Sequence, residues 1–90
     1  MYEIYRSTAF KKDIKILKKR GKNFDKLKAI IIQLASNISL EQKNRDHKLS
    51  GNWDNFRECH IEPDWLLIYK IIANTLELAR TGTHSDLFGK

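Results

Sequence analysis

The stretch RECHIEPDWLLIY at residues 57–69 predicts two strands of a sheet joined by a tight turn. Residues 56–61 alternate polar and apolar side chains, as a half-buried strand does. Pro63 fixes its own φ angle and lacks an N–H, so we expect the chain to turn there and to display Asp64. Residues 65–72 are almost all apolar or aromatic, which is typical of a central strand.

A third strand is expected at residues 75–81, after a two-residue hairpin loop at Ala73-Asn74. When the strands are paired outward from the two turns, His60 on the first strand and Arg80 on the third both lie opposite Leu67. We therefore expect His60, Leu67 and Arg80 to form one row on one face of the sheet. The outer two would be roughly 10 Å apart, which is two strand spacings.

The N-terminal part predicts one short strand and two helices. Residues 2–6 alternate as a strand does, and Ser7 or Thr8 can cap a helix that runs to about Arg20. A second helix, capped by Asn23, is indicated by apolar residues at helical spacing: Phe24, Leu27, Ile30, Ile31, Leu34 and Ile38.

These elements predict an α+β fold with the order β-α-α-β-β-β in a single domain spanning residues 1–90. We expect an antiparallel sheet with the two N-terminal helices packed on one face and the other face open. Residues 39–55 are polar and lack periodicity, so we expect a loop there, with one short extended piece around residues 47–49.

The net charge of +6 is unevenly distributed. Residues 1–50 carry 13 Lys and Arg against 5 Asp and Glu, a net +8, whereas residues 51–90 carry 4 against 6, a net −2. A basic helical part beside a nearly neutral sheet is typical of a surface that binds a polyanion, and nucleic acid fits better than a membrane. Lysines placed only for solubility are the alternative. The candidate RNA contacts on the first helix are Lys11, Lys15, Lys18 and Lys19.

The sequence carries no apolar run long enough to span a membrane and no signal-peptide pattern at its start. Its single cysteine, Cys59, cannot form an internal disulfide. Both features predict a protein that acts in the reducing cytoplasm without a membrane partner.

Three histidines, His47, His60 and His84, are the first candidates for chemistry, because imidazole can both take and give a proton near neutral pH. Cleavage of RNA by its own 2′-hydroxyl needs a base, an acid and a cation for the crowded phosphorane. Arg80 could supply the cation, and Asp64 could orient a histidine or act as the base. Ordinary surface histidines are the alternative.

A metal site is not expected. Cys59 and His60 are neighbours on a strand and point to opposite faces, and the sequence has no CxxC or HxxxH spacing. The same parity turns Cys59 away from His60, so we expect a small buried side chain and not a nucleophile. No cofactor is predicted, since the glycines lack the spacing of a phosphate-binding loop.

Four aromatic residues could stack on unpaired bases: Trp53, Trp65, Tyr69 and Phe88. Core packing is the favoured alternative for Trp65 and Tyr69, which belong to the central strand. Phe88 follows Gly82 and His84 near the end of the chain and is harder to explain as a core residue. Phe88 and Trp65 are kept as candidate RNA contacts.

Three runs of this sequence together resemble the YafQ-type branch of the RelE superfamily: DHKLSGNW at 46–53, RECHIEPDWLLIY at 57–69 and RTGTHSDLF at 80–88. These are small bacterial toxins of toxin–antitoxin pairs that cleave mRNA on the ribosome. The resemblance covers nearly the whole chain in length and element order. It implies a RelE-like fold, a cognate antitoxin protein, and mRNA and the ribosome as partners.

The resemblance also implies site residues. It assigns proton transfer and phosphate positioning to Asp64 and the histidines His47, His60 and His84, transition-state stabilisation to Arg80 and RNA contact to Phe88. It implies a reaction without a metal. Which residue is the base and which the acid stays open.

Two alternatives come from other functional classes. Relatives with the same fold poison DNA gyrase, but such a toxin needs no set of histidines for proton transfer. The chain could also be a non-catalytic module that binds RNA or protein. Replacing His60 or His84 by alanine separates these ideas, because only a catalytic site would lose cleavage while binding persists.

Overall fold

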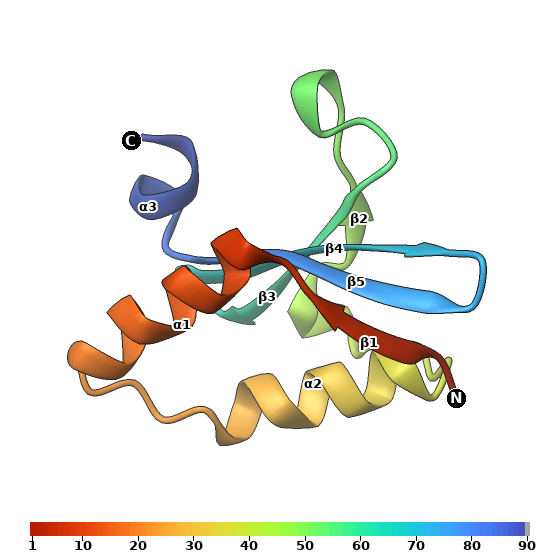
Figure 1. The fold of residues 1–90 in the computed structure, drawn as a ribbon, viewed down its shortest axis with the longest axis horizontal. Helices are drawn as coiled ribbons and strands as arrows, with labels where there is room; N and C mark the ends of the chain where they lie inside the picture. Colours follow the sequence, from red (N-terminus) through yellow and green to blue (C-terminus); the bar gives the residue numbers. More distant parts are fainter. Residues whose placement is uncertain (90) are drawn as a thin grey trace.

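The α+β fold predicted from the sequence is confirmed by a computed structural model that describes residues 1–89. Its strands form one open five-stranded sheet in the order β1-β5-β4-β3-β2. Figure 1 shows α1 and α2 along one face of this sheet, while α3 and the segment after β2 project on the other side. In chain order the elements are β1 (Glu3–Arg6), α1 (Thr8–Lys19), α2 (Asp25–Ala35), η1 (Gln42–Asn44), β2 (His47–Lys48), η2 (Gly51–Trp53), β3 (Arg57–Glu62), β4 (Trp65–Ile72), β5 (Thr75–Gly82) and α3 (His84–Phe88).

The helices begin and end where local chemistry favours it. The Ser7 hydroxyl accepts the backbone N–H of Phe10 at 3.0 Å and so caps α1, and Gly21, with φ +79°, follows its end. Helix α2 begins two residues after Asn23, whose side-chain oxygen accepts the N–H of Asp25. Ile38 lies beyond the end of α2 at Ala35 and is exposed, so it does not belong to the predicted apolar stripe of this helix.

The core lies between the two helices and the sheet. Phe10 and Leu17 of α1 and five α2 residues are buried against Cys59, Trp65, Leu67, Leu76 and Leu78 of the sheet. Burial of this apolar surface is the main source of stability for so small a fold. Cys59 is fully buried, as predicted, and burial raises the pKa of its thiol, so it is not a nucleophile.

One strand pair departs from the antiparallel sheet that we expected. The β3–β4–β5 meander and the β2–β3 pair are antiparallel, but β1 runs parallel to β5, with Glu3 opposite Thr75. Parallel neighbours need a long connection, and the chain between β1 and β5 supplies one that includes both helices. No helix in residues 1–89 is long and apolar enough to cross a membrane.

The predicted row of His60, Leu67 and Arg80 is wrong in register, because each hairpin contains a β-bulge. Around Ile61 the pairing shifts, so that His60 lies opposite Leu66, and around Ala79 it shifts so that Arg80 lies opposite Ile68. Leu66 and Ile68 are two residues apart on β4 and share a face. His60 and Arg80 therefore do share a face, as predicted, in adjacent rows and not in one.

The face of the sheet that carries His60 and Arg80 has polar residues on β3 and β5 and buried apolar residues on β4, its central strand. Leu66 and Ile68 are fully buried although they point away from the helical core. In the register they are flanked by His60 and Glu58 of β3 on one side and by Gly82 and Arg80 of β5 on the other. The sheet thus presents ionisable groups over a dry apolar floor. Such a floor strengthens their interaction with a charged ligand.

Candidate active site

His84 is the first residue of α3 and is held by Asp64, which lies in the turn between β3 and β4. One Asp64 oxygen accepts both the backbone N–H of His84, at 3.0 Å, and its Nδ1, at 2.6 Å. These two bonds, led by the backbone one, lower the pKa of the Asp64 carboxyl. Because a carboxylate can only accept, the proton of the imidazole lies on Nδ1 and Nε2 points away from Asp64.

The other two histidines are oriented in the same way by backbone carbonyls. Nδ1 of His60 lies 3.2 Å from the carbonyl of Pro63, and Nδ1 of His47 lies 2.6 Å from the carbonyl of Arg45. A carbonyl oxygen also only accepts, so both rings carry their proton on Nδ1. All three imidazoles therefore keep Nε2 available for proton transfer.

Glu58 brings the histidines together. Its Oε1 lies 3.6 Å from Nε2 of His47 and 3.7 Å from Nε2 of His60, and its side chain is only 7% exposed. The His60 and His84 rings are 5.8 Å apart between centroids. The structure thus places His47, His60 and His84 around one buried carboxylate, a residue with no role predicted from the sequence. Strand parity was the available signal, since Glu58 and His60 are two residues apart on β3.

Arg80 is fixed by a residue from the opposite end of the chain, Asp13 of α1. The Arg80 Nε and Nη2 donate to the two Asp13 oxygens at 2.7 and 3.0 Å, and the backbone N–H of Thr81 donates to the same carboxylate at 3.0 Å. Asp13 is 7% exposed, and its hydrogen bonds raise the pKa of Arg80. Two donors of the fork are used, so the remaining N–H groups of Arg80 are left for an anion.

Helix α3 is anchored to α1 by an ion pair between Arg20 and Asp86, with donor–acceptor distances of 2.7 and 2.9 Å. Asp86 also accepts the backbone N–H of Thr83, whose hydroxyl in return accepts the N–H of Asp86 in a capping box. The Arg20 guanidinium holds the pKa of the Asp86 carboxyl well below its usual range. This anchor sets the position of the helix that carries His84.

The candidate RNA contacts separate into two groups. Phe88 is 38% exposed on α3, the helix that begins with His84, and can meet a ligand. Trp65 cannot, and its assignment as an RNA contact is wrong. It is 1% exposed, packs in the core and donates its ring N–H to the Thr81 hydroxyl at 2.9 Å. The basic residues Lys11, Lys15, Lys18 and Lys19 are exposed along α1, an element that carries none of the histidines.

One group of side chains has the donor set for a metal ion. Glu58, His60 and His84 each offer a ligand atom, and these atoms lie within 4.8 Å of one another. The Nδ1 contacts of the two histidines, to Pro63 and Asp64, are the outer interactions that orient metal-binding imidazoles. The residues fit a metal that takes nitrogen and oxygen ligands, although the sequence contains no CxxC or HxxxH spacing.

Residues 2–89 match the family model described as the bacterial toxin of a type II toxin–antitoxin system, YafQ. The chain belongs to the YafQ toxin family. It is 43% identical over 88 residues to the mRNA interferase toxin YafQ of Escherichia coli, covering 97% of this chain and 96% of that one. The resemblance inferred from the three sequence runs is confirmed.

Solved YafQ-family structures share the fold closely. The YafQ chain of the Escherichia coli DinJ–YafQ complex has a TM-score of 0.91 and 42% identity, covering 99% of this chain and 100% of that one. A copper-bound mutant toxin from Helicobacter pylori has a TM-score of 0.94 and 38% identity, covering 98% of this chain and 100% of that one.

Proposed function

We propose that this YafQ-family toxin is an mRNA endoribonuclease that acts in the cytoplasm on ribosome-bound message. One observation carries the chemistry: three imidazoles have their Nδ1 atoms engaged and Nε2 available, around the buried Glu58. Proton donors and acceptors in this number suit RNA cleavage and have no role in a non-catalytic binding module. The Escherichia coli relative is an mRNA interferase, which supports the same reaction here.

The proposed reaction is an internal transesterification of RNA. The 2′-oxygen forms a bond to phosphorus as its proton passes to an imidazole Nε2. The bond between phosphorus and the 5′-oxygen breaks as a second imidazole donates a proton to that oxygen. The products are a 2′,3′-cyclic phosphate and a free 5′-hydroxyl, and the free N–H groups of Arg80 stabilise the charge on the phosphorane.

We assign the acid role to His84. The Asp64 carboxylate accepts the Nδ1–H of His84 at 2.6 Å, so in the acid role the proton that His84 gives to the 5′-oxygen is carried on Nε2, which faces away from Asp64. The base is then His47 or His60, which both approach Glu58. Asp64 acts through His84 and is a positioning residue.

We further propose that the reaction does not use a metal. Glu58, His60 and His84 could hold an ion such as the copper that is bound in a mutant toxin from Helicobacter pylori. A bound ion of this kind supplies Lewis acidity, but each imidazole ligand gives up the lone pair that proton transfer needs. On this chain, metal binding and histidine proton transfer therefore compete for the same atoms.

The ends of the RNA products test this proposal. A translated message should be cleaved equally with and without EDTA, and the products should end in 2′,3′-cyclic phosphate and 5′-hydroxyl. Cleavage without ribosomes should be much weaker. Activity that EDTA abolishes and magnesium restores, or products with 5′-phosphate ends, would refute the histidine mechanism.

We also propose that a cognate antitoxin neutralises this toxin, as the Escherichia coli complex of DinJ and YafQ suggests. The net charge of +8 in residues 1–50 favours an acidic segment of that partner. Replacing Lys11, Lys15, Lys18 and Lys19 by glutamine should slow association several-fold at low salt and much less at high salt, as measured by surface plasmon resonance. An association rate that is independent of salt would contradict this surface as the antitoxin site.

A further inference from the structure

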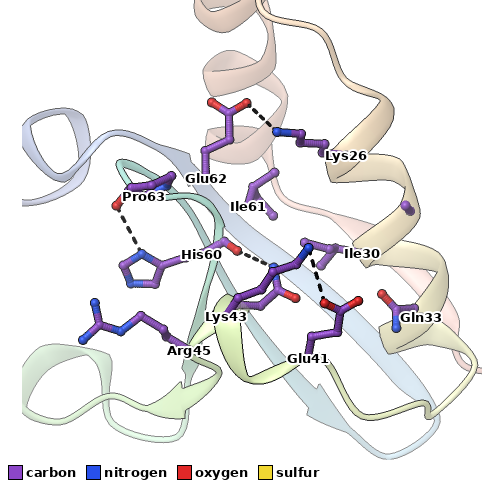
Figure 2. A pocket seen from close by; sticks show the side chains of 12 residues that line it. Lys26, Ile30, Gln33, Glu41, Lys43, Arg45, His60, Ile61, Glu62 and Pro63 are labelled. Atoms are coloured by element: carbon purple, nitrogen blue, oxygen red, sulfur yellow. Dashed lines mark hydrogen bonds and ion pairs between the residues drawn. The ribbon is translucent and has the colours of Figure 1, made fainter.

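A hollow of about 520 Å³ lies beside the histidine cluster, between α2, η1 and the turn from β3 to β4. Figure 2 shows Lys26, Ile30 and Gln33 of α2 along one side and His60 with Arg45 at the opposite side. The His60 ring points away from α2, so this residue belongs both to the rim of the hollow and to the active site. His60 thus connects the hollow, on the α2 side, with the active site on the other face of the sheet.

The floor of the hollow is apolar and its edge is polar. Ile30 and Ile61 are each 6% exposed and form the floor, while the half-buried amide of Gln33 can give and take hydrogen bonds. Asn44 closes the end near His60 by donating to its backbone carbonyl at 2.8 Å. An apolar surface next to an amide suits an unpaired base, which has apolar faces and a polar edge.

Arg45 supplies a cation at the rim. Among residues 1–89 its guanidinium makes no ion pair, whereas Lys26 is paired with Glu62 at 3.5 Å and Lys43 with Glu41 at 3.3 Å. Arg45 has the left-handed angles φ 48° and ψ 47°, which are costly for a residue with a side chain. The same backbone turn directs the Arg45 carbonyl to Nδ1 of His47 at 2.6 Å. One local conformation therefore orients a proposed catalytic imidazole and places a phosphate-binding group beside His60.

We propose that this hollow binds the unpaired nucleotide of the RNA that adjoins the bond to be cut, with its base on Ile30 and Ile61 and its phosphate at Arg45. The volume lies within the range of sites that enclose small organic ligands. This inference rests on the proposed RNA cleavage and adds a subsite that selects the base. An acidic antitoxin segment is the other conceivable occupant, but continuity with His60 favours the substrate.

Filling the hollow tests the subsite. Ala29 is exposed on α2 at the wall, so Ala29→Phe should fit the fold and block the space for the base. Across RNAs that differ only at the nucleotides flanking the cut, the ratio of kcat/KM between the best and worst substrate should fall roughly tenfold. Ile32→Phe, at an exposed position on α2 outside the hollow, is the matched control and should keep the wild-type ratio.

Arg45→Gly tests the phosphate contact separately, since glycine adopts the left-handed conformation without cost and should leave His47 in place. KM should rise roughly tenfold with kcat nearly unchanged. A fall in kcat with KM unchanged would overturn the phosphate role. If Ala29→Phe keeps the wild-type ratio of kcat/KM between the best and worst substrate, the base subsite is wrong, while the cleavage proposal stands.

Binding without cleavage distinguishes the subsite from the reaction. A 2′-O-methyl trinucleotide cannot be cut by its own 2′-oxygen, and it should shift the NMR signals of Ala29, Ile30 and Gln33 in the wild-type protein. If the trinucleotide shifts these signals but the protein does not cleave unmodified RNA, the subsite is supported and the proposed reaction fails. If the trinucleotide leaves these signals unchanged, and an acidic antitoxin peptide shifts them instead, the hollow is a partner site and the inference is wrong.

Discussion

Replacing His84 by alanine should lower the rate of RNA cleavage by about 10²- to 10⁴-fold, the usual contribution of a general acid. The imidazole is exposed, and Asp64 accepts its Nδ1–H at 2.6 Å and the backbone N–H of His84 at 3.0 Å. Its loss removes the donor to the 5′-oxygen while the rest of the site stays in place. Single-turnover cleavage of a labelled message on ribosomes measures the effect, and a binding assay should show RNA affinity within a few-fold of wild type.

A substrate with sulfur in place of the bridging 5′-oxygen identifies the role of His84. Thiolate leaves without a proton, so the His84→Ala defect should shrink by at least tenfold on this substrate. Ser85→Ala, a neighbouring exposed change on α3, should cleave both substrates like wild type. If the sulfur substrate shows the same defect as normal RNA, His84 is not the acid.

The pH dependence of this contact has a definite sign. The bonds from His84 lower the pKa of Asp64, so the contact stabilises the folded form at every pH above the ordinary carboxyl value of about 4. It is lost as the pH falls through the lowered value. Changes in the cleavage rate between pH 5 and 8 should therefore come from imidazoles and should be flatter in His84→Ala than in wild type.

Replacing Arg80 by alanine should lower kcat by roughly two to three orders of magnitude and change KM much less, because a preorganised cation acts mainly on the phosphorane. Asp13→Asn should give a smaller loss, since the guanidinium remains and only one of the two oxygens that it contacts at 2.7 and 3.0 Å is replaced by an amide NH₂ group, which cannot accept. Arg6→Ala, at an exposed arginine on β1, is the control and should be active. Rapid-quench kinetics on ribosome-bound message measure all three.

Stability must be separated from catalysis in this test. Arg80→Ala leaves the nearly buried Asp13 carboxylate without its guanidinium, which destabilises the fold. The double variant Asp13→Asn with Arg80→Ala removes that unpaired charge and should recover much of the lost melting temperature without recovering kcat. If kcat returns with stability, Arg80 has a structural role only.

Much of the fold could be predicted from local patterns. The capping Ser7 and the apolar period of α1 and α2 depend on neighbouring residues only, and the turn at Pro63 does too. The candidate site was predicted in part for the same reason. His60 and Arg80 were expected on one face from their pairing with the central strand. Each bulge shifts that pairing by one residue, and because both residues are shifted, they still share a face.

Errors arose where a residue's surroundings come from distant parts of the chain. Trp65 is an aromatic residue of the kind that stacks on RNA bases, but it is buried in the core beneath the helices. The short helix α3 was missed because its five residues carry little periodic signal, and its position depends on the Arg20–Asp86 ion pair. The parallel β1–β5 pair could not be foreseen from alternation, which is the same in both orientations.

The sequence by itself determined which groups this protein has for chemistry, the elements that carry most of them and the family that it belongs to. Only the tertiary structure decided how those groups meet. It brought His84 to Asp64, 20 residues away, and it paired Arg80 with Asp13, 67 residues away. Periodicity and turns are encoded over a few residues, whereas bulges and ion pairs between distant elements follow from the packing of the whole chain.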